Sequence, residues 1–186
     1  MDLALFDQKL KGAPPAHHAD DVWARLCCEQ AQLSNAEGSY AVGAVLISDS
    51  QELLSYGRNT VFGRGFQSGR HAEMEVIDRM ERDYPGLDKS GMTLFVSLEP
   101  CLMCFGRILL AGIGRVRYLS EDPVGGFTRG VHFLPPVWAE LSHRTSFEQA
   151  DVSDYWKELA QDLVEENAGD MREKVAAAWK GHNSGL

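Results

Sequence analysis

The sequence predicts an α/β domain in which helices pack against a mixed β-sheet. Segments with a helical spacing of apolar residues alternate with short runs rich in valine, isoleucine and leucine. Two of these runs are joined by a polar turn alone, as in an antiparallel hairpin. Each later run follows a helix, as parallel crossovers require. A chain of 186 residues can bury one such core, so we expect a single domain over residues 1–186.

The first half of the chain is expected to supply a helix, a hairpin and a loop. Asp20 suits the cap of a helix whose apolar residues recur every three or four positions as far as Leu33. Residues 40–48 are rich in valine, isoleucine and leucine and too few for a helix, so they predict a buried strand. A polar turn leads to a second strand near residues 53–59, which completes the hairpin. Three glycines then predict a loop over residues 60–70.

Two helix–strand pairs follow this loop. Apolar residues repeat at helical spacing over 71–84, and the run 93–98 predicts a compact strand. A second helix is expected over 101–111, where glycines end it, and another short strand over 116–119. These elements complete an expected core of about residues 20–122.

Beyond this core the sequence predicts a mainly helical extension. Two prolines favour the start of a short helix over 135–141, and residues 147–152 suit a final strand. A stripe of apolar residues predicts a helix over 154–166, and a separate last helix is expected over 171–180. The helical extension thus occupies about residues 150–180.

The charge of the chain is acidic and unevenly distributed. Its 18 basic and 27 acidic residues give a net charge of −9. Nine acidic and only two basic residues lie between Glu148 and Glu173, so this segment alone supplies −7. Proteins that bind nucleic acids gain affinity by neutralising phosphates, so this balance disfavours RNA or DNA as a partner. The rest of the chain is close to neutral, which leaves room for a local basic patch.

The sequence gives no sign of a membrane or of an oxidising compartment. The longest apolar stretch lies within residues 40–47, whereas a membrane span needs roughly 20 apolar residues. The N-terminus has an early acidic residue, Asp2, and no basic segment, so we expect a cytoplasmic protein. Cys27 and Cys28 are adjacent within a predicted helix, where they suit small buried side chains better than a disulfide.

One histidine and two cysteines are candidate metal ligands. His71 begins a predicted helix, and Cys101 and Cys104 lie about one turn apart at the start of another. Unpaired N–H groups at a helix start favour the thiolate form of a cysteine. Three protein ligands leave one tetrahedral position open, which is typical of a catalytic zinc ion. Glu73, two residues after the histidine, is then left free for proton transfer.

These residue types predict a hydrolytic reaction. Zinc lowers the pKa of bound water from about 15.7 toward about 7, so that hydroxide forms at neutral pH. Glu73 would take that proton and deliver protons to a ring nitrogen and a departing amine. Attack by hydroxide on an amino-bearing aromatic carbon would then release ammonia.

The cysteine pair has two other interpretations. A Pro-Cys-x-x-Cys segment at a strand-to-helix junction is also found in redox pairs of the thioredoxin type. The His-x-Glu segment upstream disfavours that interpretation, because a redox pair does not need it. A structural zinc module would need a fourth ligand, and no further histidine has a motif context.

The motif residues resemble the cytidine-deaminase-like superfamily, whose zinc-dependent members carry H-x-E followed by P-C-x-x-C. Residues 71–122 are most similar to tRNA adenosine deaminases and to bacterial guanine and nucleobase deaminases. The matching segments are His71-Ala72-Glu73, Leu98-Glu99-Pro100-Cys101-Leu102-Met103-Cys104, Gly112-Ile113-Gly114-Arg115-Val116, Val42-Gly43-Ala44-Val45-Leu46 and Gly57-Arg58-Asn59. The resemblance covers about residues 20–122. It implies a three-layer α-β-α sandwich around a mixed five-stranded sheet, with extra C-terminal helices.

The resemblance also implies roles for individual residues and a partner. By this resemblance, His71, Cys101 and Cys104 would bind one zinc ion per chain, and Glu73 would be the proton shuttle. Asn59 would hydrogen-bond the substrate, the backbone at Ala44 would lie beneath its ring, and Phe105 would line either the pocket or the core. A homodimer is expected on the same ground.

Three functions follow, in order of preference. The first is a zinc-dependent hydrolytic deaminase of a free nucleobase, a nucleoside or a similar aminated heterocycle. The second is a tRNA-specific adenosine deaminase, whose basic surface would have to come from Arg58, Arg64, Arg70 and Arg129. Against it, the segment before His71 lacks the Asp-Pro-Thr-Ala run typical of those enzymes, and the chain departs from their pattern after Asp122. The third is a noncatalytic zinc-stabilised interaction domain, in which Glu73 would have no use.

Overall fold

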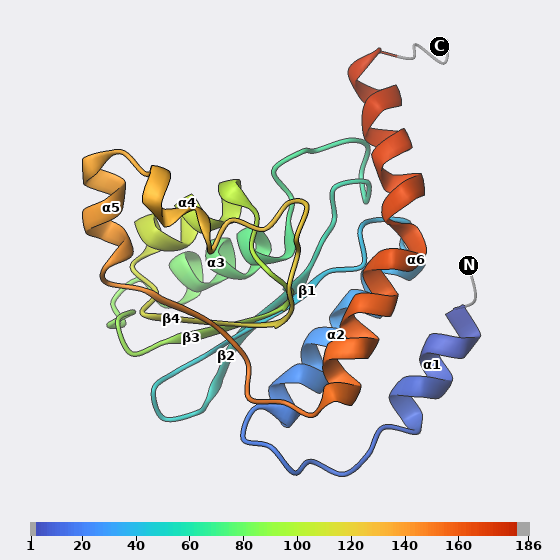
Figure 1. The fold of residues 1–186 in the computed structure, drawn as a ribbon, viewed down its shortest axis with the longest axis horizontal. Coiled ribbons are helices and arrows are strands. Elements are labelled where there is room, and N and C mark those ends of the chain that lie inside the picture. Colours follow the sequence, from blue (N-terminus) through green and yellow to red (C-terminus); the bar gives the residue numbers. More distant parts are fainter. Residues whose placement is uncertain (1–2, 182–186) are drawn as a thin grey trace.

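A computed structural model describes residues 3–181, so residues 1–2 and 182–186 of the expected 1–186 domain lie outside the description. The structure is a five-stranded mixed sheet with helices on both faces (Figure 1), which confirms the predicted fold class. Its elements in chain order are α1 (Leu3–Lys11), α2 (Asp21–Ala36), β1 (Gly43–Ile47), β2 (Leu53–Arg58), α3 (Ala72–Asp83), β3 (Thr93–Leu98), α4 (Leu102–Ala111), β4 (Arg115–Ser120), the 3-10 helix η1 (Gly130–Phe133), α5 (Pro136–Ser142), β5 (Ser146–Gln149) and α6 (Asp154–Trp179).

The strand order in the sheet is β2-β1-β3-β4-β5. Strand β1 is antiparallel to both of its neighbours, β2 and β3, and the first of these pairs is the predicted hairpin. Strands β3, β4 and β5 are parallel to one another. Because β2 and β3 both oppose β1, they point the same way, and α3 is the crossover between them. The carboxyl ends of β2 and β3 therefore lie at the same edge of the sheet.

The sheet separates two apolar cores, as the alternating side chains of β1 show. Val45 and Ile47 are buried against α1, α2 and α6, whereas Ala44 and Leu46 are buried against α3 and α4. Figure 1 shows α1, α2 and α6 on one side of the sheet and α3, α4 and α5 on the other. A Cβ at Gly43 would collide with the carbonyl oxygen of α2 residue Cys27, so glycine allows this helix to pack directly on the strand.

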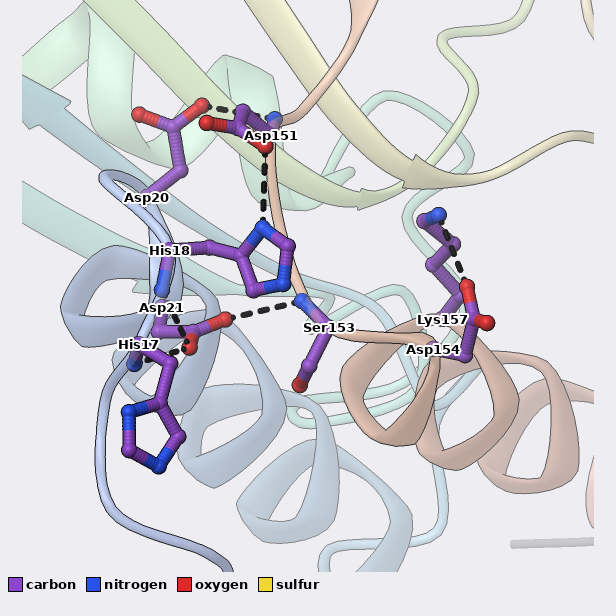
Figure 2. A network of polar contacts seen from close by, with 8 residues as sticks. All are labelled: His17, His18, Asp20, Asp21, Asp151, Ser153, Asp154 and Lys157. Atoms are coloured by element: carbon purple, nitrogen blue, oxygen red, sulfur yellow. Dashed lines mark hydrogen bonds and ion pairs between the residues drawn. The ribbon is translucent and has the colours of Figure 1, made fainter.

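The start of α2 is organised by Asp21, and the expected cap, Asp20, makes no capping hydrogen bond. Asp21 is only 2% exposed, and its carboxylate accepts hydrogen bonds from the backbone N–H groups of His17, His18 and Ser153 at 2.9–3.0 Å. Figure 2 shows this network, in which Asp20 accepts a hydrogen bond from the connection before α6 instead. Asp21 thus joins two segments that lie 132 positions apart.

Helix α6 is continuous, so the expectation of two helices, over 154–166 and 171–180, was wrong. The Asn167 side chain is fully buried and donates hydrogen bonds from Nδ2 to Asn35 Oδ1 and to the carbonyl oxygen of Ser39, both at 2.8 Å. These bonds hold the helix where the sequence suggests a break. Gly169 follows with nothing around it, and one glycine inside a helix costs only about 1 kcal/mol.

Helix α1 was not predicted from the sequence. Only two of its side chains, Phe6 and Leu10, are buried, which is too few to produce a clear helical period. No helix within residues 3–181 is both long enough and apolar enough to cross a lipid bilayer.

Candidate active site

The three candidate metal ligands meet at two helix starts. His71 is the N-cap of α3, Cys101 is the N-cap of α4, and Cys104 lies in the first turn of α4. Both caps have extended backbones, with φ and ψ of −73° and 159° at His71 and −71° and 170° at Cys101. The loop after β2 and the turn after β3 deliver these helices to the same edge of the sheet, where α/β proteins commonly bind ligands.

The spacing of the ligand atoms fits a tetrahedral zinc ion. His71 Nδ1 lies 3.7 Å from Cys101 Sγ and 3.6 Å from Cys104 Sγ, and the ligand atoms all lie within 4.8 Å of one another. Zinc bonds of 2.0–2.1 Å to nitrogen and 2.3 Å to sulfur, at tetrahedral angles, place these atoms about 3.5 Å apart. Within residues 3–181 no fourth side chain joins this group. One coordination position is therefore left for water or substrate.

The electrostatics of the site favour a thiolate at Cys101. The hydrogen bond from the Cys104 thiol, together with the His71 ring, outweighs burial and lowers the pKa of Cys101 to about 4. The same hydrogen bond, together with burial, raises the pKa of Cys104. Burial lowers the pKa of His71, but its bond to Cys101 and the nearby charge of Glu73 outweigh burial and give a net increase. The thiolate of Cys101 and the imidazole of His71 therefore face each other in the site.

Glu73 is buried beside the metal ligands. Its side chain is 3% exposed, and burial raises the pKa of its carboxyl group despite the nearby charge of His71. Because His71 is a cap residue with an extended backbone, it and Glu73 both reach the same cavity although they lie only two positions apart. A carboxyl group whose pKa is moved toward neutrality is suited to accepting a proton and then releasing it.

His71, Cys101 and Glu73 line a cavity of about 160 Å³. Apolar and polar side chains from both halves of the chain form its wall. The lining residues are Tyr40, Val42, Asn59, His71, Glu73, Leu98, Glu99, Cys101, Asp122 and Val164. The site can therefore hold a small ring next to a metal ion and a buried proton carrier.

The family of the chain follows from comparison with known proteins. A model of the cytidine and deoxycytidylate deaminase zinc-binding region matches residues 17–120. This chain belongs to that zinc-binding deaminase family. The matched segment contains all three ligands, Glu73 and Asn59, so the cluster described above is the expected zinc site of the deaminase domain.

Curated relatives include deaminases of different substrates. The tRNA-specific adenosine deaminase of Bacillus subtilis (strain 168) is 32% identical over 107 residues, which are 58% of this chain and 65% of that protein. That of Agrobacterium fabrum is 32% identical over 133 residues, with coverages of 66% and 86%. The cytosine deaminase of Candida albicans is 33% identical over 92 residues, with coverages of 50% and 60%. This chain thus spans just under two thirds of the Bacillus relative.

Solved structures show the same fold. A structure from a study of A-to-I editing by tRNA:A34 deaminases has a TM-score of 0.62 at 24% identity, and covers 74% of this chain and 95% of its own. The guanine deaminase of Nitrosomonas europaea has a TM-score of 0.60 at 20% identity, with coverages of 84% and 90%. Both likenesses support the α-β-α architecture of this chain.

The structure places the three residues that were predicted to bind substrate in different surroundings. Asn59 lines the cavity, and its Oδ1 accepts the N–H of Val61 at 3.1 Å, which leaves Nδ2 for a ligand. Ala44 is fully buried in the core between the sheet and α3, and it does not line the cavity. Phe105 is also buried; it stacks on Phe147 with 4.7 Å between ring centroids and lines a separate apolar groove beside α5.

Sequence reasoning assigned no role in the site to six of the residues that line the cavity. They are Tyr40, Val42, Leu98, Glu99, Asp122 and Val164. Glu99 and Asp122 each follow a strand, a position at which polar side chains commonly face a ligand, so a signal was present for these two. Val164 lies in α6, whose apolar stripe predicted only a packed helix.

The arginines considered for a basic surface are largely paired with carboxylates. Arg58 lies 2.6 Å from Glu37, and Arg70 lies 2.6 Å from Glu75. Arg129 lies 2.5 Å from a third carboxylate, that of Glu121. Three of the four arginines are thus neutralised locally, which weakens their attraction for a polyanion.

Proposed function

We propose that the chain is a hydrolytic deaminase of a small aminated heterocycle, such as a free nucleobase or a nucleoside. The observation that carries this proposal is the shared cavity of Glu73, His71 and Cys101. A buried carboxyl group beside an incompletely coordinated metal site has a use in proton transfer and none in a purely structural site. The noncatalytic alternative is disfavoured for this reason.

The proposed mechanism assigns each step to a side chain of the cavity. Zinc held by His71, Cys101 and Cys104 would act as a Lewis acid that lowers the pKa of water. Glu73 accepts a proton from the attacking water and delivers protons to the ring nitrogen and to the departing amine. Asn59 donates a hydrogen bond from Nδ2 to the ring edge and so orients it. Overall, one water molecule is consumed, an amino group is replaced by oxygen, and one ammonia is released.

Three features of the structure favour a small substrate over tRNA. The cavity of about 160 Å³ is small compared with the roughly 300–1,000 Å³ of drug-sized sites, so it suits a single heterocycle. Val164 in the wall belongs to α6, a helix with more acidic than basic residues, and this charge disfavours a polyanionic partner. The arginines that are paired with carboxylates offset little of this negative charge. A flipped RNA base would instead need a basic surface around the cavity to bind the flanking phosphates.

A tRNA-specific adenosine deaminase is the second candidate. The observation in its favour is the 32% identity to the proteins of that name from Bacillus subtilis and Agrobacterium fabrum. Contacts with phosphates make affinity fall steeply with salt. Binding of an anticodon stem–loop RNA that weakens steeply between low and physiological salt would favour this candidate, and no binding at low salt would remove it.

An ammonia-release screen of the zinc-loaded chain tests the first proposal. The panel is adenine, guanine, cytosine, their nucleosides, pterins and triazines, with the stem–loop RNA as a further substrate. Glu73→Gln should keep zinc and lose at least roughly 100-fold in turnover, because only proton transfer is removed. Glu81→Gln, on the same helix but paired with Arg107 at the surface, is the matched control and should keep full activity. Normal turnover by Glu73→Gln would contradict the assigned role.

We also propose that the chain forms a homodimer. Exposed apolar side chains lie on α4, on η1 and on α5, where a second copy would bury them. They are Leu102, Met103, Leu110, Phe133 and Val137. Sedimentation equilibrium would then give a dimer for the unmodified chain and a monomer for Leu110→Glu.

A further inference from the structure

Glu99 is a buried carboxylate that lies between the metal-binding turn and the loop after β4. It is 4% exposed and lies two positions before Cys101. Its Oε2 accepts the backbone N–H of Asp122 at 3.1 Å. Its Oε1 accepts the backbone N–H of Thr128 at 3.1 Å and also the hydroxyl of that residue. Three donors from one loop therefore converge on a single carboxylate, which can accept all of them.

Backbone contacts fasten the same loop to the metal-binding turn. Phe127 N–H donates to the carbonyl oxygen of Pro100 at 3.0 Å, and Gly126 forms a β-bridge with Cys101. A Cβ at Gly126 would lie 2.5 Å from Cδ of Glu99 and 2.6 Å from its Oε2. The loop therefore passes so close to the carboxylate that only glycine fits without displacement.

The fastened loop, residues 121–128, forms part of the cavity wall. Asp122 lines the cavity, and its Oδ1 accepts the N–H groups of Val124 and Gly125 at 3.0 Å and 2.9 Å. The loop backbone thus fixes the carboxylate of Asp122, and the carboxylate of Glu99 fixes the loop backbone. The family match ends at residue 120, so Glu99 links the shared metal motif to a wall that lies outside the matched region.

We propose that Glu99 is a positioning residue that fixes loop 121–128, and through it Asp122, against the metal-binding turn and so determines which heterocycles bind in the cavity. This role rests on the proposed deaminase function. Glu99 acts through the loop, because its carboxylate oxygens are engaged by loop donors. A glutamine in its place presents one oxygen and one NH₂ group, so it cannot accept from both sides of the loop.

Glu99→Gln tests this role with two readouts. The amide hydrogens of Asp122 and Thr128 should exchange at least roughly ten-fold faster than in the unmodified chain, while those of β4 stay unchanged. On the purine, pyrimidine and nucleoside panel, KM should rise roughly ten-fold or more with a smaller change in kcat, because the wall and not the proton carrier is displaced. Zinc content should not change. Glu52→Gln, at an exposed glutamate in the turn between β1 and β2, is the matched control and should leave both readouts unchanged.

Two further variants keep the test decisive if Glu99→Gln does not fold. Thr128→Val removes only the hydroxyl donor, and Gly126→Ala displaces the carboxylate from the other side. Both should accelerate amide exchange at Asp122 and raise KM in the same direction.

Unchanged amide exchange at Asp122 and Thr128 in these variants would show that Glu99 does not fix the loop. Faster amide exchange with unchanged KM would show that fixing the loop does not determine which heterocycles bind. A chain that deaminates nothing on the panel would refute the proposed function. The amide-exchange measurement would still show whether Glu99 fixes loop 121–128. In that case the loop would be fixed for another ligand.

Discussion

Residues 17–120 and residues 121–181 contribute to the same cavity in different ways. The first region supplies the metal ligands and Glu73 from two helix starts, at spacings that can be recognised in the sequence. The second supplies Asp122 from a loop and Val164 from a helix, with no motif at either position. The residues proposed for the reaction thus lie in one region, whereas the cavity wall is shared with the other. A family match to the first region therefore leaves the substrate open.

The largest effect is expected at the metal ligands of the first region. Cys101→Ala should lose zinc, because two remaining ligands cannot hold the ion tightly. At a zinc concentration of 100 times the dissociation constant, loss of the metal removes about 2.7 kcal/mol from the free energy of unfolding. Zinc content by mass spectrometry and thermal unfolding with and without chelator would measure both effects.

Cys28→Ala is the matched control for this prediction. Cys28 is fully buried in α2 and is not part of the metal cluster, so its variant should lose some packing energy and keep its zinc. Full zinc occupancy in Cys101→Ala would show that the first region does not bind metal as described.

A smaller effect is expected at Asp21, which joins the two regions. Asp21→Asn removes one of two charged oxygens that accept backbone hydrogen bonds, so the free energy of unfolding should fall by about 1.5–3 kcal/mol at pH 7. Asp20→Asn, at the neighbouring position, should cost less, since Asp20 accepts a single such bond from Asp151. Urea denaturation of the three proteins would rank them. A free energy of unfolding that is the same in Asp21→Asn as in the unmodified chain would show that the network does not join the regions energetically.

The effect at Asp21 should also depend on pH. Burial raises the pKa of this carboxyl group, but hydrogen bonds from Ser153, His17 and His18 outweigh burial and lower it below its ordinary value of 3.8. A lowered pKa in the folded state means that the stabilisation is complete above pH 3.8 and disappears as the pH falls through the folded value. The difference between the unmodified chain and Asp21→Asn should therefore narrow in acid. A difference that stays constant down to pH 2 would contradict this.

The sequence predicted the first region better than the second for physical reasons. The boundaries of β3 and the starts of α3 and α4 follow from local patterns, namely a β-rich run and cap positions next to glycine or proline. The placement of Asp122 and Val164 depends on contacts between distant segments, and a single sequence does not record them. The same holds for the capping by Asp21, whose partner Ser153 is 132 positions away. These features were not predicted because they depend on long-range contacts and not on local sequence preference.

The smallest effect, of opposite sign, is expected at Gly169 in α6. The sequence around this glycine suggested a break, whereas the structure has a continuous helix with open space at this position. If the helix is continuous, Gly169→Ala should raise the free energy of unfolding by about 0.5–1 kcal/mol, because alanine loses less backbone entropy. Gly112→Ala is the contrasting variant, since the φ of Gly112 is 75° and alanine there should destabilise. A loss of stability in Gly169→Ala, measured by urea denaturation, would mean that the chain turns at residue 169. The second region would then be two helices, and only the part up to Val164 would belong to the cavity wall.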